Sequence, residues 1–236
     1  MSIPAITTDQ MREVDRLMIE DYGIELIQML ENAGRHLAVL ACQRFLANDP
    51  IDKRVLVLVG SGGNGGGGLV AARRLHNWGA QVQVYLTKTK RHFKGIPAHQ
   101  MDILNRMKVP VEVADDKTKM PDADLILDAI IGYSLRGAPR GMAAHLIHLA
   151  NLSGVPILSL DIPSGLDTTT GEVHDPHIRA DATLTLALPK TGLFQKTVES
   201  YIGELYLADI GVPPQLYAAL SLEVGPIFSS GEILNI

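Results

Sequence analysis

The sequence contains little cysteine, few long hydrophobic runs and only a small excess of negative charge. Its single cysteine, Cys42, cannot form a disulfide within the chain, which favours a reducing compartment. The formal net charge of −5 argues against a broad basic surface for nucleic acid. No apolar run approaches the roughly 20 residues that span a bilayer, and the first residues lack the pattern of a targeting segment. We therefore expect a cytoplasmic protein that binds neither nucleic acid nor a membrane.

Aliphatic side chains and glycine are abundant instead. Of the 236 residues, 46% are hydrophobic but only 5% are aromatic, and 22 are glycines. This composition fits the α/β class with many short connections, and the length fits one large domain or at most two small ones. We expect a single domain over residues 1–236. Two helices are predicted before the first strand. The first has a capping box between Thr7 and Gln10 and ends near Gly23, and the second, more apolar helix runs from Leu26 to Ala41.

Strands and helices alternate after residue 53. Buried strands are predicted at 54–59, 82–86, 111–113, 124–131, 156–160, 181–188 and 204–210, and helices at 69–78, 96–107 and 143–152. A glycine-rich loop at 60–68 joins the first strand to the helix after it. This alternation predicts a doubly wound, mostly parallel sheet.

Ligands bind such sheets beyond the carboxyl ends of the strands, near the point where the strand order reverses. The rule selects the glycine loop, the strand that carries Asp128, and the strand that ends at Asp161. If the first and fourth strands are neighbours, the loop and both carboxylates face one cleft. Two carboxylates in one cleft take on different pKa values and therefore different roles in acid–base chemistry. Lys190, which follows a later strand, is a further candidate for this cleft.

The glycine loop predicts a phosphate site. Residues without Cβ let backbone N–H groups approach an anion, and the following helix presents its positive end. Three of its glycines match the dinucleotide-binding spacing: Gly60, Gly62 and Gly65. The loop lacks the lysine of a P-loop. The second strand ends without the acid that would bind a ribose and carries Thr87, Lys88 and Lys90 instead. This disfavours a conventional NAD oxidoreductase and leaves a basic pocket for a 2′-phosphate open.

The remaining candidates are structural. His145 and His148 lie three residues apart on a predicted helix, and His174 and His177 flank a predicted turn. Neither pair has the third ligand of a zinc site. Cys42 lies on the apolar helix and is interpreted as a packing residue.

Several motifs occur together in order along the chain, and they resemble the YjeF N-terminal domain family, whose enzymes are NAD(P)H-hydrate epimerases. The resemblance extends over almost the whole chain and rests on the residues 10–15 (QMREVD), 29–35 (MLENAGR), the glycine loop, 127–134 (LDAIIGYS), 161–167 (DIPSGLD) and 186–190 (LALPK).

The resemblance implies a Rossmann-like three-layer α/β/α sandwich that forms a homodimer and interconverts the R and S forms of hydrated NADH or NADPH. It implies Asp161 as the catalytic acid/base and a potassium ion (K+) held by Asn64, Asp128 and Ser164. It implies substrate contacts from Asn32, Gly63, Asn64, Gly65, Gly66, Gly67, Gly132, Tyr133, Ser134, Leu135, Arg136, Gly137, Ala138, Asp161 and Lys190. The helix over Leu26–Leu40 is apolar on more than one stripe, which agrees with a face covered by a partner subunit.

The glycine loop departs from the family at two positions. The family loop commonly reads Asn-Asn-Gly-Gly-Asp-Gly, whereas here Gly63 replaces the first Asn and Gly67 the Asp. The loss of two polar contacts, each worth about 1–3 kcal/mol when buried, supports an alternative hypothesis. In that alternative the chain is a catalytically weakened nucleotide-binding or scaffold member of the family.

Overall fold

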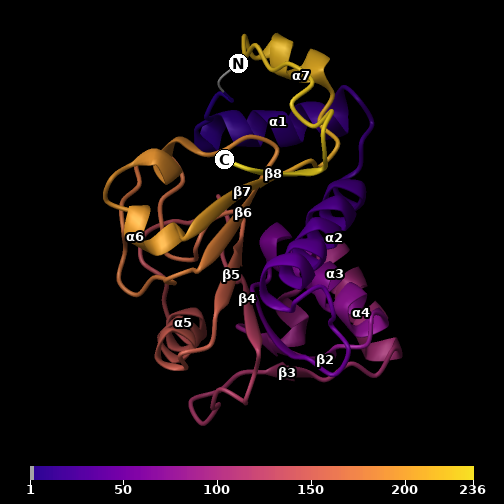
Figure 1. Cartoon of the computed structure of the whole chain (residues 1–236), viewed down its shortest axis with the longest axis vertical. Helices are drawn as coiled ribbons and strands as arrows, with labels where there is room; N and C mark the ends of the chain where they lie inside the picture. The colour runs from indigo at the N-terminus through magenta and orange to yellow at the C-terminus, as the bar shows by residue number, and fades with distance from the viewer. Residues whose placement is uncertain (1–2) are drawn as a thin grey trace.

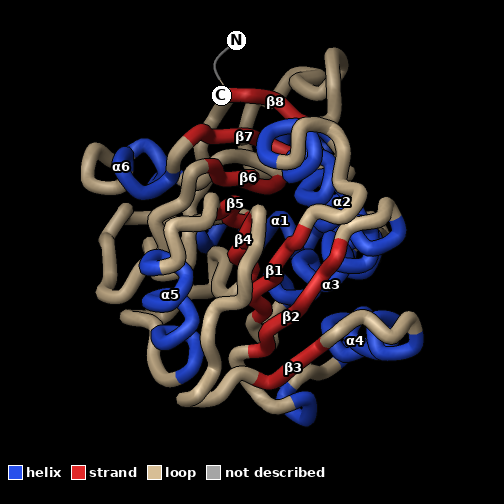
Figure 2. The backbone as a smooth tube through the Cα atoms, turned by 60° about the horizontal axis from the view of Figure 1, so that its bottom comes forward, coloured by secondary structure: helices blue, strands red, loops and turns tan. Residues whose placement is uncertain are grey.

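The computed structural model describes residues 3–236 and contains one mostly parallel sheet flanked by helices (Figures 1 and 2). The strand order is β3-β2-β1-β4-β5-β6-β7-β8, with every pair parallel except β7–β8. The strands are β1 (Arg54–Val59), β2 (Gln81–Leu86), β3 (Val111–Val113), β4 (Leu125–Ala129), β5 (Ile157–Leu160), β6 (Ala182–Leu186), β7 (Glu204–Ala208) and β8 (Ile233–Asn235).

Helices cover both faces of the sheet, which gives the three-layer α/β/α arrangement that we expected. Figure 1 shows α2, α3 and α4 on one face and α5 and α6 on the other, with α1 and α7 at the end of the molecule nearest β8. The helices are α1 (Thr8–Glu20), α2 (Leu26–Phe45), α3 (Gly63–Asn77), α4 (Gly95–Arg106), α5 (Met142–Leu152), α6 (Glu199–Ile202) and α7 (Pro214–Ala219). None of the helices in this part of the chain is long and apolar enough to cross a membrane.

The first two helices form where the sequence predicted them. Thr7 caps α1: its Oγ1 accepts a hydrogen bond from Gln10 N at 3.2 Å, and Gln10 Oε1 accepts one from Thr7 N at 2.9 Å. The capping box satisfies two N–H groups that the helix start would otherwise leave unpaired. The second helix, α2, extends to Phe45 and packs against α3. Its apolar surface is therefore buried largely within the chain.

The strand order reverses beside β1, as expected. β1 pairs with β2 on one side and with β4 on the other. Helices that follow the two neighbouring strands must leave the sheet in different directions, which opens a crevice at their carboxyl ends. The residues after β1, β4 and β5 therefore meet at one edge of the sheet.

The prediction of a glycine loop over residues 60–68 was wrong in its extent. Helix α3 begins at Gly63 and not at Leu69. A Cβ on Gly65 would lie 1.8 Å from Gly60 O, and one on Gly68 would lie 2.4 Å from Ala129 Cβ. These glycines let the first turns of α3 lie directly against β1 and β4, and this packing outweighs the poor helix propensity of glycine.

Three short elements near the C-terminus were not predicted: α6, α7 and β8. The edge strand β8 has only three residues and runs antiparallel to β7. The predicted strands at 124–131 and 181–188 are shorter in the structure, where they span Leu125–Ala129 and Ala182–Leu186.

Candidate active site

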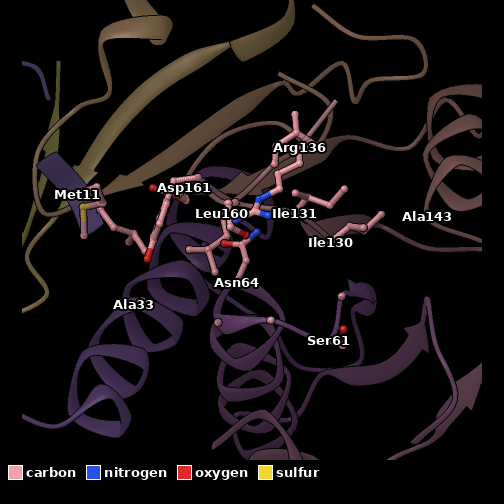
Figure 3. A pocket seen from close by; sticks show the side chains of 18 of the residues that line it. Met11, Ala33, Ser61, Asn64, Ile130, Ile131, Arg136, Ala143, Leu160 and Asp161 are labelled. Carbon is pink, nitrogen blue, oxygen red and sulfur yellow. Dashed lines mark hydrogen bonds between the residues drawn. The ribbon is translucent and has the colours of Figure 1, made fainter. Parts of the chain in front are cut away.

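A pocket of about 800 Å³ lies at the carboxyl ends of β1, β4 and β5, which is the size range of small-molecule sites. One wall is apolar and comes from α1 and α2. The opposite wall consists of the start of α3 and the segment after β4. In Figure 3 the side chains of Asn64, Asp161 and Arg136 extend into this space from three different elements. The lining residues from α1 and α2 are Met11, Asp15, Ile19, Leu26, Met29, Leu30 and Ala33.

Asp161 stands directly after β5 with a backbone φ of +69°, in the left-handed region that a non-glycine residue rarely adopts. Its backbone N–H donates to Leu184 O at 2.7 Å, which holds the turn against β6. The residue is 3% exposed, and Oδ2 accepts a hydrogen bond from Tyr133 N at 3.0 Å. Such strain concentrates at functional sites, and here it directs the carboxylate into the pocket.

Lys190 neutralises Asp161. Its side chain is fully buried, and Nζ lies 2.5 Å from Asp161 Oδ1. The hydrogen bonds of the ammonium go to Leu186 O at 2.8 Å and Thr185 Oγ1 at 3.3 Å. The ammonium therefore forms a close ion pair with Oδ1 while its hydrogen bonds to Leu186 and Thr185 hold it in place.

Asn64 and Asp161 approach the same glycine. A Cβ on Gly132 would lie 3.1 Å from Asn64 Oδ1 and 3.1 Å from Asp161 Oδ2. The amide of Asn64 is only lightly held, because its Nδ2 is buried with no hydrogen-bond partner among the residues that the structure describes. A residue with a side chain at position 132 would fill the space between the two groups.

The expectation that Asp128 faces the pocket was wrong, since its carboxylate lies beneath the pocket floor. Asp128 is fully buried and accepts hydrogen bonds from Ser164 Oγ at 2.6 Å, Ser164 N at 2.8 Å and Ser159 Oγ at 2.9 Å. Burial raises the pKa of Asp128, and the hydrogen bonds from Ser164, Ile130 and Ser159 oppose that shift. No basic side chain within residues 3–236 forms an ion pair with it.

The oxygen atoms around Asp128 suit a hard monovalent cation in their chemistry. A cation there would supply the counter-charge that the buried carboxylate lacks. Ser164 Oγ is 3.2 Å from Ile131 O, and the uncommitted amide of Asn64 lies at the same edge of the sheet. No cluster of three or more His, Cys, Asp or Glu side chains suited to a metal occurs in the described chain.

The other predicted substrate contacts divide into two groups. Gly63 and the whole segment Gly132–Ala138 line the pocket together with Asn64 and Asp161. The buried glycines Gly65, Gly66 and Gly67 lie behind the wall, and Asn32 donates to Ile210 O at 3.3 Å outside the lining. A Cβ on Gly67 would lie 2.8 Å from Leu160 Cδ2, whereas one on Gly63 would meet open space.

Sequence reasoning missed one polar contact of the pocket. The Tyr133 hydroxyl donates a short hydrogen bond to Asp15 Oδ2, across 118 residues of sequence. Burial is the main reason that the pKa values of both Asp15 and Tyr133 are raised. The sequence contained one signal for this contact: Asp15 lies four residues from both Met11 and Ile19, so that an acid interrupts an apolar face of the helix.

Comparison with known proteins agrees with this site. The family model described as YjeF-related protein N-terminus matches residues 26–192. An NAD(P)H-hydrate epimerase of Dehalogenimonas lykanthroporepellens is 43% identical over 94% of this chain and 88% of its own length. A second NAD(P)H-hydrate epimerase, from Rhodopirellula baltica, is 31% identical over 94% of this chain and 90% of its own.

Two further proteins show the extent of the match. The chain covers 41% of a bifunctional NAD(P)H-hydrate repair enzyme Nnr of Moorella thermoacetica, at 36% identity over 90% of this chain. The crystal structure of yeast ynu0 superimposes with a TM-score of 0.83 at 27% identity, over 99% of this chain and all of that one. Sequence, fold and pocket together show that this chain belongs to the family of YjeF-related N-terminal domains.

Proposed function

We propose that this protein is an isomerase of nicotinamide cofactor repair, an NAD(P)H-hydrate epimerase that interconverts the R and S forms of hydrated NADH and NADPH. The observation that carries the proposal is Asp161, a buried carboxylate held in a strained turn against a dinucleotide-sized pocket. Relatives of similar length that bear this name support it. The scaffold alternative is not favoured, since Asp161 lines the pocket and the bonded pair of Asp128 and Ser164 lies beneath it.

The proposed chemistry takes place at the carbon that carries the added hydroxyl, C6 of the hydrated nicotinamide ring. Protonation of this hydroxyl lets it leave as water, because the ring nitrogen next to C6 supports the resulting cation. Water then returns to the other face. Asp161 exchanges a proton at this carbon as the acid/base, a task worth typically about 10²–10⁴ in rate. When it is ionised, the Asp161 carboxylate near the ring also stabilises the cation.

The rest of the pocket suits the remainder of a dinucleotide. The N-terminus of α3, with Gly62 and Gly63 open to the pocket, offers backbone N–H groups to the diphosphate. Lys88, Arg136 and Arg140 also line the pocket and are exposed. These cations complement the phosphate charges. The apolar wall from α1 and α2 suits the nicotinamide ring.

The test of function uses a single epimer of hydrated NADH. Purified protein is expected to produce the other epimer, measured by chromatography, well above the spontaneous rate. Asp161→Asn keeps the size of the side chain and is expected to lose at least about 10²-fold in rate. The proposal fails if the parent protein leaves the epimer ratio unchanged, or if Asp161→Asn is as active as the parent.

A potassium ion bound by Asn64, Asp128 and Ser164 belongs to the same proposal. When bound, the cation would stabilise negative charge at the pocket floor and orient the start of α3. Its support is the uncompensated charge of Asp128 among oxygen donors. Potassium is expected to raise the melting temperature of the parent more than lithium at equal ionic strength. Asp128→Asn should remove that difference, and equal effects of both salts on the parent contradict the site.

A homodimer and a cytoplasmic location complete the proposal. The apolar surface of α2 alone does not require a partner, because α3 and the neighbouring strands cover much of it. Ile19 and Tyr22 near the end of α1 are exposed apolar side chains that a second copy would cover. Sedimentation at micromolar concentration tests the dimer, and cell fractionation tests the location.

A further inference from the structure

The pocket wall contains a second carboxylate that the proposed function does not use. Among the described residues that line the pocket, Asp15 and Asp161 are the two acids. Asp15 lies on α1 between Met11 and Ile19, four residues from each, so that all three face the same side of the helix. A carboxylate in the middle of an apolar stripe loses hydration and needs a specific reason to be there.

One tyrosine connects the two acids. The Tyr133 hydroxyl donates to Asp15 Oδ2, and the Tyr133 backbone N–H donates to Asp161 Oδ2 at 3.0 Å. The carboxylates therefore lie at the two ends of a single residue, one on α1 and the other after β5. Each of these bonds uses only one carboxylate oxygen: Asp161 Oδ1 faces the Lys190 ammonium at 2.5 Å, and Asp15 Oδ1 is left for another partner.

The surroundings of the two acids differ. Asp161 faces the Lys190 ammonium at 2.5 Å, whereas Asp15 accepts from a neutral phenol. Burial raises the pKa of Asp15, and the charge of Asp161 adds to this, while the hydrogen bond from Tyr133 and the charge of Lys190 oppose it. Arg12, on the same helix as Asp15, forms its ion pair with Asp9 on the exposed side.

Epimerisation through a planar cation requires proton transfer on both faces of the ring. The hydroxyl leaves from one face and water adds to the other, so one fixed carboxylate serves only one of the two events. We propose that Asp15 is the second proton-transferring residue, acting on the ring face opposite to Asp161. This inference rests on the proposed epimerase function.

The step is balanced when the two acids share one proton. The Asp15 carboxyl protonates the hydroxyl on C6, the C6–O bond breaks, and water leaves as the ring nitrogen forms a double bond to C6. Water attacks the opposite face, a new C6–O bond forms, and the Asp161 carboxylate accepts the released proton. The reverse reaction uses the same groups in the opposite sense. Exchange with solvent water returns the proton to Asp15.

The test compares three variants with the parent protein: Asp15→Asn, Tyr133→Phe and the control Glu13→Gln. Glu13 lies on the exposed side of α1, two residues from Asp15. Epimerisation is measured in both directions across pH, and unfolding transitions check that each variant folds. Asp15→Asn is expected to lose about 10²–10⁴-fold in rate, and Glu13→Gln to keep the parent rate.

Tyr133→Phe separates catalysis from support. It removes the hydrogen bond that lowers the pKa of Asp15, so that this pKa rises and the alkaline fall in activity moves to higher pH. If Asp15 only anchored Tyr133, the amide oxygen introduced by Asp15→Asn would still accept the hydrogen bond from the Tyr133 hydroxyl. Asp15→Asn would then lower the epimerisation rate less than Tyr133→Phe does. A folded Asp15→Asn variant within threefold of the parent overturns this inference alone. An inactive parent overturns the epimerase function and this inference with it.

Discussion

Lys190 gives the sharpest stability test, because its ammonium is fully buried against Asp161. Replacing it by methionine keeps the length and the apolar stem of the side chain but removes the charge. The buried carboxylate of Asp161 then keeps only the hydrogen bond from Tyr133 N. Removal of one partner from a buried ion pair costs about 3–5 kcal/mol. We expect Lys190→Met to lower the free energy of unfolding by this amount.

The double variant Lys190→Met/Asp161→Asn tests the cause of that loss. It leaves neither charge in the protein interior, so we expect it to be about 2 kcal/mol or more stable than Lys190→Met alone. Urea unfolding followed by circular dichroism measures the free energy of unfolding of the parent, of each single variant and of the double variant, which together form a double-mutant cycle. A loss below about 1 kcal/mol for Lys190→Met, or simple addition of the two single effects, refutes the buried pair. Neither variant should reach the parent's epimerase rate, since Lys190→Met removes the counter-ion of Asp161 and the double variant also removes the carboxylate itself.

Two further predictions concern the glycine helix and an exposed ion pair. Gly67→Ala places a Cβ 2.8 Å from Leu160 Cδ2 and should cost about 1–3 kcal/mol of stability. The Cβ of Gly63→Ala meets open space and should change the stability by less than about 0.5 kcal/mol. Equal melting temperatures of the two variants contradict this prediction. Hydrogen bonds from Arg44, and then from Tyr206, lower the pKa of Glu204 from 4.5 to about 2, so its stabilising effect is present above pH 4.5 and is lost as the pH falls toward 2. Because the Arg44–Glu204 pair is exposed, we expect it to contribute only about 0.2–1 kcal/mol to the free energy of unfolding. The difference in this free energy between the parent and Glu204→Gln should shrink between pH 4.5 and 2. A difference that stays constant down to pH 2 contradicts the prediction.

The glycine segment shows where local propensity fails. The many glycines within residues 60–68 predict a loop before the helix, since glycine is a poor helix former. The structure instead starts α3 at Gly63, because the missing side chains allow the helix to lie against Gly60 O and Ala129. The gain is tertiary packing, which no window of sequence contains. The same reason explains why a Gly67 that departs from the family pattern lies against Leu160 rather than in the pocket.

Long-range polar pairs show a second limit. The sequence marked Asp161 and Lys190 as candidates through their positions after strands, but it contained no sign that they form an ion pair. Asp15 was not singled out at all, because its partner Tyr133 is 118 residues away. Asp128 does lie near the end of β4, as the sequence indicated. Its side chain nevertheless lies beneath the pocket floor, where it accepts hydrogen bonds from Ser159 and Ser164.

The amino-acid sequence by itself determined the α/β class, the two leading helices, most strands and the edge of the sheet where the pocket lies. These follow from local periodicity, capping residues and the rule that parallel strands present their carboxyl ends together. Only the tertiary structure decided which side chains meet there: Asp161 with Lys190, Tyr133 with Asp15, and Asn64 beside Gly132. Side-chain direction and burial depend on how distant segments pack, and that packing is set by the whole chain at once.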